Sequence, residues 1–422
     1  GFVPSRSCFH TNQHRAYNYL FFPQILAKIT SASKFIGQRG IKVDFELTEE
    51  QKMFQTMVRD FCAKEIEPYA AEWDETEKFP HETIKKMADA GLYGVHFPEE
   101  YGGSGDEVTF TIACEEIAHA SAGLSVSYLC SLGLGMYPIL MHGNEQQKRE
   151  YIPRVIKGAT VAFALTEPMA GSDVAALEMR YTGEGDYYIL NGNKTFISNG
   201  AEADFITTFA TRDKSLGYRG ISAFVVDKGT PGFSVGKIEK KMGLHPASAT
   251  ELVFDNCKIP GANMVGEEGR GFRVALEAID ASRVSIAAQA LGIAQAAFDA
   301  AVAYSKERKQ FGMELARLQA IQWMIADMAT DIETARLLTY KAAWLTGKEG
   351  HAPLKESAMA KLYAAEAAHR VCHKAVQIFG GYGYTKDFTV ERYYRDQRIT
   401  EIYEGTSEMQ RMTIARQVLG VK

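Results

Sequence analysis

The sequence predicts an α+β multidomain protein in which a helical region, a β region and a second helical region follow one another. Apolar residues recur at helical spacing before about residue 160 and after about residue 270, and short β-branched and aromatic runs lie between them. This order excludes a doubly wound nucleotide-binding fold, whose strands and helices alternate along the chain. A chain of 422 residues has room for about three domains. We expect an extension at 1–42, an α domain at 43–160, a β domain at 161–270 and an α domain at 271–422.

The composition is that of an ordinary globular protein, with 46% hydrophobic and 23% charged residues, which excludes a disordered chain. The formal net charge is −5, but residues 1–42 carry six basic side chains and no acidic one, so the remaining residues are clearly acidic. An acidic body argues against nucleic-acid binding, which requires a basic face. No apolar run reaches the ~18 residues that a membrane span needs, so we expect no membrane span.

Residues 1–42 resemble an organelle transit segment, because they are basic, acid-free and rich in serine and aromatic residues. They begin with glycine, so a tag or an artefact of where the reading frame was opened explains them equally well. Val43-Asp44-Phe45 has the features of a natural bacterial start. We therefore expect a bacterial cytoplasmic protein, or a mitochondrial matrix protein where residues 1–42 are a genuine transit segment.

Cysteine and histidine spacing gives no support for a metal site. The six cysteines lie far apart without a Cys-x-x-Cys pair, which is typical of reduced, buried thiols rather than of disulfides or zinc ligands. His369 and His373 have the i, i+4 spacing of zinc ligands, but Arg370 follows His369 where a metalloprotease carries glutamate. We therefore expect structural histidines and no metal.

Helices are expected in two groups. The first group opens with a capping box, because Thr48 can cap a helix and Gln51 can reach back to it. Its further helices are expected at 81–91, 108–120, 122–142 and 145–157. After residue 270, long Ala- and Leu-rich segments with short connections predict a domain of the four-helix-bundle type. The helices expected there are 271–308, 314–346, 354–379 and 406–419, the last ending at Gly420.

A β-hairpin is the clearest feature of the middle region. Residues 187–190 and 194–197 read as strands around Asn191-Gly192, the strongest short turn signal. Further strands are expected at 205–210, 221–226 and 251–254, separated by Gly and Pro residues. Several short strands at this spacing predict a small antiparallel barrel or sandwich.

Three segments carry the residue types of a cofactor or catalytic site, and each also has an ordinary structural interpretation. Small and hydroxylated residues at 165–173 can approach a ligand closely or form an irregular interdomain turn. At 402–408 a carboxylate precedes a helix, either as a reactive group or as an acidic cap. At 307–312 basic residues end a helix, where Arg308 either satisfies the helix terminus or holds a pyrophosphate. The sequence contains no phosphate loop and no serine elbow, so P-loop nucleotide binding and serine hydrolysis have no support.

Together these segments resemble the acyl-CoA dehydrogenase family over residues 44–422. The matching motifs are Thr-Glu-Pro-x-Ala-Gly-Ser-Asp at 166–173, Asn-Gly-x-Lys-x-Phe-Ile-Ser-Asn-Gly at 191–200, Arg-Lys-Gln-Phe-Gly at 308–312, Gln-Ile-Phe-Gly-Gly-Tyr-Gly-Tyr at 377–384 and Ile-Tyr-Glu-Gly-Thr-Ser-Glu at 402–408. The resemblance is strongest to the short-chain, butyryl-type branch. It implies FAD as cofactor and a homotetramer built as a dimer of dimers, with cofactor sites shared between subunits.

The resemblance also assigns contacts residue by residue. It places Phe163, Leu165, Thr166, Ser172, Phe196, Ile197 and Ser198 beside the flavin, with Thr166 and Ser198 hydrogen-bonding its edge. It gives Arg308, Phe311, Gln319, Gln377, Gly380 and Gly381 to the FAD of a neighbouring subunit, and Thr406 and Glu408 to further FAD contacts. Ser172, Asp280, Ser282, Arg283, Gly405 and Arg416 match positions that contact the acyl-CoA substrate.

Glu404 matches the family's catalytic base, which removes the weakly acidic thioester α-proton in a site closed to water. The isovaleryl-type branch takes its base from the position of Ser282, and serine cannot serve there. The resemblance implies that the Glu404 backbone N–H and a flavin hydroxyl hold the thioester oxygen. In our alignment Gly123 stands where glutaryl-type relatives carry arginine, which disfavours a dicarboxylyl substrate.

The resemblance thus implies FAD-dependent conversion of a short straight-chain acyl-CoA into trans-2-enoyl-CoA, a step of fatty acid β-oxidation. Electrons would pass to an electron-transfer flavoprotein. An acyl-CoA oxidase or an enoyl-CoA reductase on the same fold, and a medium-chain substrate, are the alternatives within the family. A flavin-free helical scaffold is the alternative outside it, and the intact Glu404 and flavin motifs argue against it.

Overall fold

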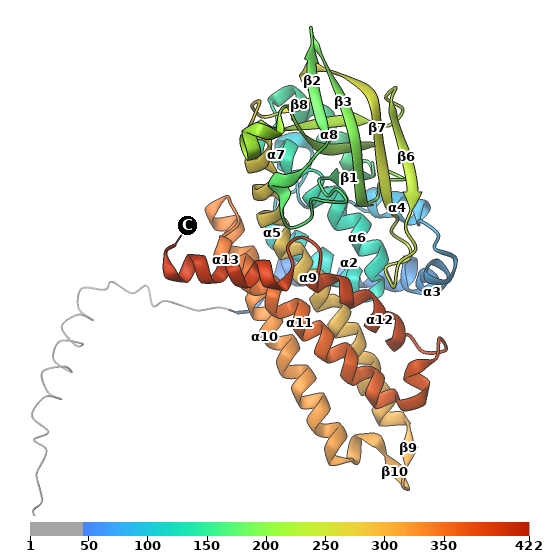
Figure 1. Ribbon diagram of the computed structural model, residues 1–422. Helices are drawn as coiled ribbons and strands as arrows, with labels where there is room; N and C mark the ends of the chain where they lie inside the picture. The colour runs from blue at the N-terminus through green and yellow to red at the C-terminus, as the bar shows by residue number, and fades with distance from the viewer. Residues whose placement is uncertain (1–44, 422) are drawn as a thin grey trace, which may run out of the picture. The chain divides into compact units, whose positions relative to one another are not determined.

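The computed structural model describes residues 45–421, in which helical, β and helical regions follow one another (Figure 1). This order confirms the predicted fold class. The expectations for residues 1–42, including the transit segment, lie outside the described residues.

The N-terminal region consists of α2 (Glu49–Glu65), α3 (Glu67–Thr76), α4 (His81–Asp89), α5 (Glu107–Ala120), α6 (Ala122–Leu129), α7 (Tyr137–His142) and α8 (Glu145–Ile156). The capping box is present, because the Thr48 hydroxyl accepts from the Gln51 backbone N–H (3.2 Å) and the Gln51 side chain accepts from the Thr48 N–H (3.0 Å). The helix expected at 122–142 is interrupted, because a π-helical turn at Cys130–Leu134 separates α6 from α7.

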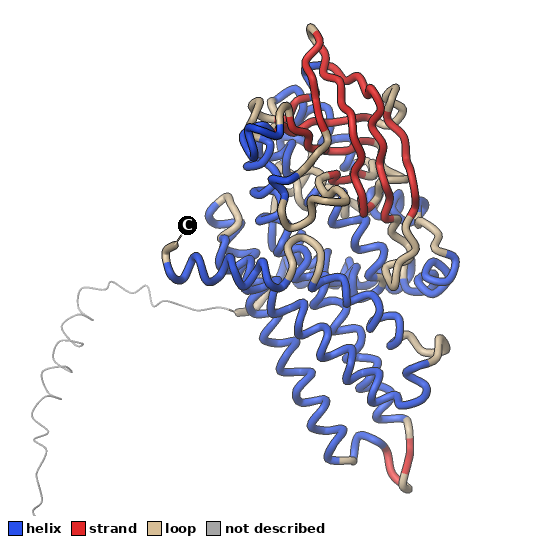
Figure 2. The backbone as a smooth tube through the Cα atoms, in the orientation of Figure 1, coloured by secondary structure: helices blue, strands red, loops and turns tan. Residues whose placement is uncertain are grey.

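The middle region contains β1 (Val161–Ala164), β2 (Arg180–Glu184), β3 (Tyr187–Ser198), β4 (Phe205–Thr211), β5 (Ile221–Asp227), β6 (Phe233–Ile238), β7 (Ala249–Pro260) and β8 (Met264–Val265). These strands form one mixed sheet of order β6-β7-β3-β2-β4-β5-β8, with β1 paired to β4 beside this path (Figure 2). The expected purely antiparallel arrangement is wrong in one respect, because β1 and β2 both pair with β4 in parallel. Side-chain alternation is the same in both orientations, so it could not distinguish them.

The hairpin expected at Asn191-Gly192 is wrong, because both residues lie inside the continuous strand β3. The chain turns instead at residues 185–186, between β2 and β3. Gly192 lies at a bulge opposite β7 with φ of 140°, and a Cβ there would lie 2.8 Å from the Met179 Cα. Close backbone approach, rather than a reversal of the chain, therefore explains this glycine.

The C-terminal region contains α9 (Gly271–Glu307), β9 (Lys309–Gln310), β10 (Met313–Glu314), α10 (Gln319–Glu349), α11 (Leu354–Phe379), α12 (Val390–Gln397) and α13 (Ser407–Leu419). Helices α9, α10 and α11 pack on one another, and α5 packs on α9 and α10 (Figure 1). The helix expected at 314–346 begins later, because β9 and β10 form a short hairpin. Phe311 and Gly312 make its turn with φ of 54° and 78°.

Small buried residues, mostly alanine, allow the long helices to pack closely on one another. The stretch Ala122–His142 and α9 are long and apolar enough to cross a membrane, but 83% and 67% of their apolar windows are buried inside the protein. Such burial is typical of core helices. The five described cysteines are free and buried, and residues 45–421 contain no group of three His, Cys, Asp or Glu side chains that could hold a metal.

Candidate active site

Glu404 lies in a tight turn between α12 and α13. Its backbone is left-handed, with φ of 50°, and Gly405 follows with φ of 90°. Thr406 caps α13, because its hydroxyl accepts a hydrogen bond from the Met409 N–H (3.3 Å). Glu404 is therefore not the acidic cap that was the structural alternative for this segment. Its Oε2 atom is buried and finds no hydrogen-bond partner among the described residues.

Side chains from two helices hold the carbonyl groups of this turn. Gln410 Nε2 donates hydrogen bonds to Glu404 O (3.3 Å) and Gly405 O (2.9 Å), and Lys361 Nζ of α11 donates to Gly405 O (2.7 Å). A Cβ at residue 405 would lie 2.6 Å from Gln410 Nε2, so the close approach requires glycine. The backbone of the turn is thus fixed while it presents the Glu404 carboxyl group.

Burial raises the pKa of Glu404 from 4.5 to about 7, and three neighbours oppose this shift. Contact with Ser282 and the positive charges of Lys361 and Arg283 favour the ionised carboxylate. A carboxylate that titrates near neutral pH is a stronger base than a solvated one, and about half of it is still ionised at pH 7. The turn therefore offers a half-buried general base whose buried Oε2 has no hydrogen-bond partner among residues 45–421.

Two residues of α9 assigned to the substrate, Ser282 and Arg283, interact with this base, and a third, Asp280, pairs with Arg283. Arg283 Nη2 lies 2.7 Å from Asp280 Oδ1, and burial lowers the pKa of Arg283. Arg283 Nε and Nη1 are buried and have no hydrogen-bond partner within residues 45–421. Buried polar groups are normally satisfied, so these donors and Glu404 Oε2 mark a place for a polar ligand.

The segments assigned to the flavin lie side by side in the middle region. The Thr195 N–H donates to Thr166 O (2.9 Å), which joins the loop after β1 to β3. The Phe163 ring packs on Phe209 in the core, with ring centroids 5.0 Å apart, so its side chain is committed to the interior. The other assigned residues differ in burial: Leu165 and Ile197 are buried, Thr166 and Ser198 are half-buried, and Ser172 is exposed.

Phe196 is an exposed aromatic residue within β3. Its φ is 57° and 65% of its surface is accessible, although a left-handed backbone is strained for a bulky residue. Strain of this kind concentrates at ligand sites, where surrounding structure enforces it. The exposed ring therefore offers a face for a flat group.

Arg308, Gly380 and Gly381 meet at a surface hollow of about 500 Å³. The Arg308 guanidinium lies 5.4 Å from the centre of the Tyr382 ring. A Cβ at Gly380 or Gly381 would meet nothing within 4 Å, so packing requires neither glycine, although the backbone of Gly380, with φ of 61°, favours one. Three further residues assigned to this site are exposed outside the lining of the hollow: Phe311, Gln319 and Gln377.

Three other assigned residues lie at or near the surface of α13. Arg416 is exposed in the last turn of α13. Thr406 and Glu408 take part in capping α13, and hydrogen bonds from Thr406 and its own backbone lower the pKa of Glu408. Their assigned contacts with substrate or FAD stay predictions.

Gly123, which our alignment places where glutaryl-type relatives carry arginine, lies against Pro246 of the middle region. A Cβ at Gly123 would lie 2.5 Å from the Pro246 Cδ, so a longer side chain does not fit beside Pro246 in this chain. The expectation that a dicarboxylyl substrate is disfavoured stays a prediction.

Family models match the chain over almost all of its described length. They are the N-terminal, middle and C-terminal domains of acyl-CoA dehydrogenase, over residues 48–159, 162–257 and 269–419. The chain belongs to the acyl-CoA dehydrogenase family. Members of this family are FAD-dependent oxidoreductases, so the resemblance inferred from the sequence is confirmed.

Relatives within the acyl-CoA dehydrogenase family cover both directions of the reaction. The short-chain specific acyl-CoA dehydrogenase of Clostridium acetobutylicum is 49% identical over 379 residues, which are 89% of this chain and 100% of that protein. The acryloyl-CoA reductase (NADH) of Anaerotignum propionicum is 46% identical over 389 residues, or 92% of this chain and 98% of that protein. A solved structure described as the electron transferring flavoprotein of Acidaminococcus fermentans aligns with a TM-score of 0.88 and 47% identity, over 89% of this chain and 100% of that chain.

The described residues fit the FAD of an acyl-CoA dehydrogenase. The exposed Phe196 ring suits the flat flavin, and the hollow beside Arg308 suits the pyrophosphate half. The open glycines Gly380 and Gly381 let a ligand approach the backbone closely. Internal packing explains neither the exposed Phe196 ring nor the glycine at 381.

A buried ion pair that was not predicted from the sequence lies between the loop at 165–173 and β3. Lys194 Nζ of β3 lies 2.7 Å from Glu167 Oε1 and donates to Leu165 O (3.1 Å), and both charged side chains are buried. The Met179 N–H donates to the same Glu167 carboxylate (3.1 Å). The pair therefore ties the loop at 165–173 to β3. No local pattern marks this pair, because Glu167 lies between Thr166 and Pro168, and polar residues flank Lys194 on both sides.

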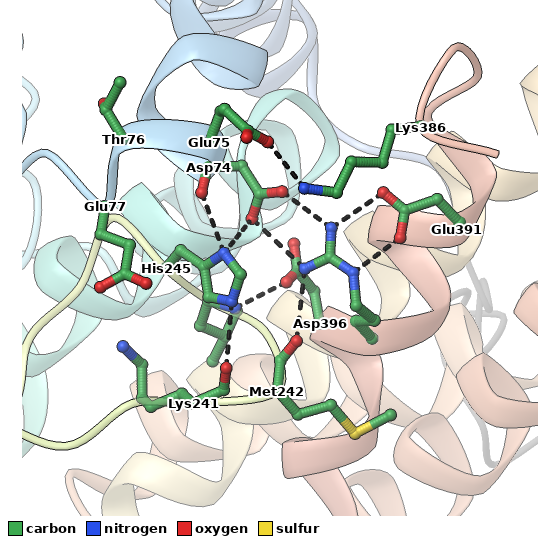
Figure 3. A network of polar contacts seen from close by, with 12 residues as sticks. Asp74, Glu75, Thr76, Glu77, Lys241, Met242, His245, Lys386, Glu391 and Asp396 are labelled. Carbon is green, nitrogen blue, oxygen red and sulfur yellow. Dashed lines mark hydrogen bonds and ion pairs between the residues drawn. The ribbon is translucent and has the colours of Figure 1, made fainter.

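A network of polar contacts fixes α12, which leads into the Glu404 turn (Figure 3). Arg395 Nη2 lies 2.7 Å from Asp74 Oδ2 of α3, and His245 Nδ1 lies 3.1 Å from Asp74 Oδ1. The Asp396 side chain accepts a hydrogen bond of 2.6 Å from the backbone N–H of Leu244. Segments from all three regions of the chain thus hold the helix that precedes the candidate base.

Proposed function

We propose that the chain catalyses FAD-dependent α,β-dehydrogenation of a short straight-chain acyl-CoA to trans-2-enoyl-CoA. The observation that carries the proposal is the carboxyl group of the half-buried Glu404, whose Oε2 is buried and unpartnered and whose pKa is raised to about 7. Such a group suits proton removal from carbon α to a thioester, a weak acid that water would not deprotonate.

The proposed chemistry uses Glu404 as the base. Its Oε2 accepts the α-proton when the Cα–H bond breaks. FAD, when bound, would supply the acceptor for the hydride of the β-carbon. Within residues 45–421 no acceptor takes the Glu404 backbone N–H, so this donor is available for the thioester oxygen. Arg283, through its unpartnered donors, is a further contact for the polar part of the substrate.

We propose a short acyl chain, an electron-transfer flavoprotein as electron acceptor and a homotetramer as the assembly. The name of the Clostridium acetobutylicum relative supports the short chain, and that of the Acidaminococcus fermentans structure supports the acceptor. The hollow at Arg308 lies on the surface of one subunit, as a cofactor site shared between subunits requires. A bacterial cytoplasm is the compartment we propose, since the reported relatives are bacterial.

The test is anaerobic bleaching of the flavin absorbance by butyryl-CoA and by octanoyl-CoA, in wild type and in Glu404→Gln. We expect butyryl-CoA to bleach wild type quickly, while E404Q retains FAD and stays yellow because it lacks the base. Glu401→Gln, a nearby carboxyl substitution, is the matched control and should bleach like wild type. Faster bleaching by octanoyl-CoA contradicts the short-chain proposal, and no bleaching by either compound contradicts the reaction.

A reductase is the second candidate, because the Anaerotignum propionicum relative carries that name. It uses the same residues, with Glu404 returning the α-proton to an enoyl-CoA. Reduced enzyme mixed anaerobically with acryloyl-CoA and with crotonyl-CoA distinguishes it, since a reductase regains its yellow colour much faster than it bleaches with the saturated thioester. Admitting air to reduced enzyme then tests the oxidase alternative, which predicts rapid reoxidation.

A further inference from the structure

Lys361 of α11 is a fully buried lysine that the proposed chemistry leaves unused. Its neighbours along the buried face of the helix are alanines, at 358, 364 and 365. Burial lowers the pKa of Lys361 to about 8, so the amine is still protonated at neutral pH. A buried ammonium group is costly unless it is paired and hydrogen-bonded, so its contacts explain its presence.

The contacts of Lys361 converge on the turn that holds the candidate base. Its Nζ donates a hydrogen bond to Gly405 O at 2.7 Å. The charge of Glu404 stabilises the protonated amine most, with smaller contributions from Glu401 and Glu408. In return, the charge of Lys361 favours ionised Glu404. Lys361 therefore interacts with this turn in two ways, through a hydrogen bond to the backbone and through its charge on Glu404.

A hydrogen bond alone does not explain a lysine at this position. The neutral side chain of Gln410 already donates to Gly405 O and to Glu404 O. What Lys361 adds is a positive charge beside a carboxyl group that burial would otherwise keep protonated.

We infer that Lys361 is a positioning residue for the base: its amine holds the Glu404–Gly405 turn, and its charge increases the fraction of Glu404 that is ionised and able to accept a proton. This inference rests on the proposed function of Glu404. It predicts that removal of the charge weakens the base while the fold and the bound FAD are retained.

Other groups also face Glu404, and they are the same in wild type and in a variant of Lys361. Ser282 and the charge of Arg283 on α9 favour the ionised form. Four neutral groups from other elements lie within range of its charge, because Glu404 raises the pKa of each: Cys114, Cys130, Tyr137 and Tyr403. Since these groups are unchanged in a Lys361 variant, a shift in the titration of Glu404 is attributable to Lys361.

The first experiment compares pH profiles of anaerobic flavin reduction by butyryl-CoA in wild type and Lys361→Met. We expect the midpoint of the K361M profile to move up by about one unit. At pH 7 that shift leaves about one carboxylate in ten ionised instead of about one in two, so reduction slows about fivefold. The rates should converge at pH 9, and the affinity for butyryl-CoA should change little. Lys374→Met, on the same helix and paired with Asp327, is the matched control with an unshifted profile.

The second experiment needs no substrate and separates failure of this inference from failure of the proposed function. It measures denaturant unfolding of FAD-saturated wild type, K361M, E404Q and the double variant, at pH 7.5 and pH 5.5. We expect K361M to lower the unfolding midpoint more in wild type than in the E404Q background at pH 7.5. The difference should vanish at pH 5.5, where Glu404 is protonated.

The same cycle with K374M should show no coupling at either pH. A K361M effect that is equal in both backgrounds at pH 7.5, or a coupling that persists at pH 5.5, overturns the inference and leaves Lys361 a packing residue. If no acyl-CoA reduces the wild-type flavin, the proposed function fails, but this cycle still decides whether Lys361 ionises Glu404.

Discussion

Left-handed backbone marks several of the residues that bear on function. Of the seven non-glycine residues with positive φ in residues 45–421, three were assigned to the site from the sequence: Phe196, Phe311 and Glu404. Such conformations cost of order 1–3 kcal/mol each, and they persist only where surrounding contacts enforce them. At Glu404 those contacts are the hydrogen bonds from Gln410 and Lys361 to the turn.

The raised pKa of Glu404 predicts a pH-dependent loss of stability. Between pH 4.5 and about 7 the folded protein binds more protons at this site than the unfolded chain does, so stability falls as pH rises through this window. From pH 5 to pH 8, wild type should therefore lose about 2 kcal/mol more than Glu404→Gln does. Denaturant unfolding at both pH values measures this. An equal loss in E404Q and wild type contradicts the burial of the charge, and Glu401→Gln should behave like wild type.

At the scale of single residues, the base could be predicted from the sequence, but Lys361, which holds its turn, could not. Glu404 stands in a recognisable motif, whereas Lys361 reads as one more charged residue in an Ala-rich helix. Only its register with Ala358 and Ala365 on the buried face of α11 distinguishes it. The position of Lys361 on the helix is informative only when the buried face of α11 is known. That face is defined by the packing of α11 on neighbouring helices, which the sequence does not show.

Among the elements, the loop after β1 depends on the buried Glu167–Lys194 pair. Lys194→Met leaves the Glu167 carboxylate buried without its cation, so we expect a loss of about 3–5 kcal/mol in unfolding free energy and a fall in bound FAD. The double variant Glu167→Leu with Lys194→Met should recover part of the stability, because no unpaired charge remains. Denaturant unfolding and the flavin-to-protein absorbance ratio test both.

The matched control for that prediction is Lys237→Met, whose exposed side chain pairs with Glu239. Surface substitutions of this kind change stability by roughly 0.5 kcal/mol or less. A K194M loss no larger than that of K237M would show that the pair does not hold the loop.

Elements were predicted well where a single local signal decides them, and less well where pairing decides them. The capping box at Thr48 and the ends of α9 and α11 depend on neighbouring residues, and they agree with the structure to within a few residues. The Asn191-Gly192 signal was misread because a glycine that relieves a clash with Met179 has the same sequence as one that reverses a chain. The parallel pairing of β1 with β4 likewise depends on contacts between distant segments.

At the scale of the whole molecule, the Asp74 network joins residues more than 300 positions apart, which no local pattern predicts. Asp74→Asn removes the buried charge that pairs with Arg395 and His245, so we expect a loss of about 3 kcal/mol in unfolding free energy and slower flavin reduction with FAD retained. Glu75→Gln is the matched control, because its exposed pair with Lys386 is worth at most about 1 kcal/mol. Equal effects of D74N and E75Q on unfolding would refute a role for the network.

The surface hollow at Arg308 predicts that cofactor binding depends on assembly. If a neighbouring subunit completes the site, Arg308→Glu should lower the flavin-to-protein absorbance ratio several-fold, because a carboxylate there repels the pyrophosphate of FAD. The raised pKa of Glu404 should be unaffected, since the two residues lie at separate sites. Lys157→Glu makes a similar charge change on the exposed end of α8 and should retain FAD. Sedimentation of wild type over a dilution series should show FAD lost together with the higher assembly; FAD retained by dissociated monomers would place the whole cofactor site within one subunit.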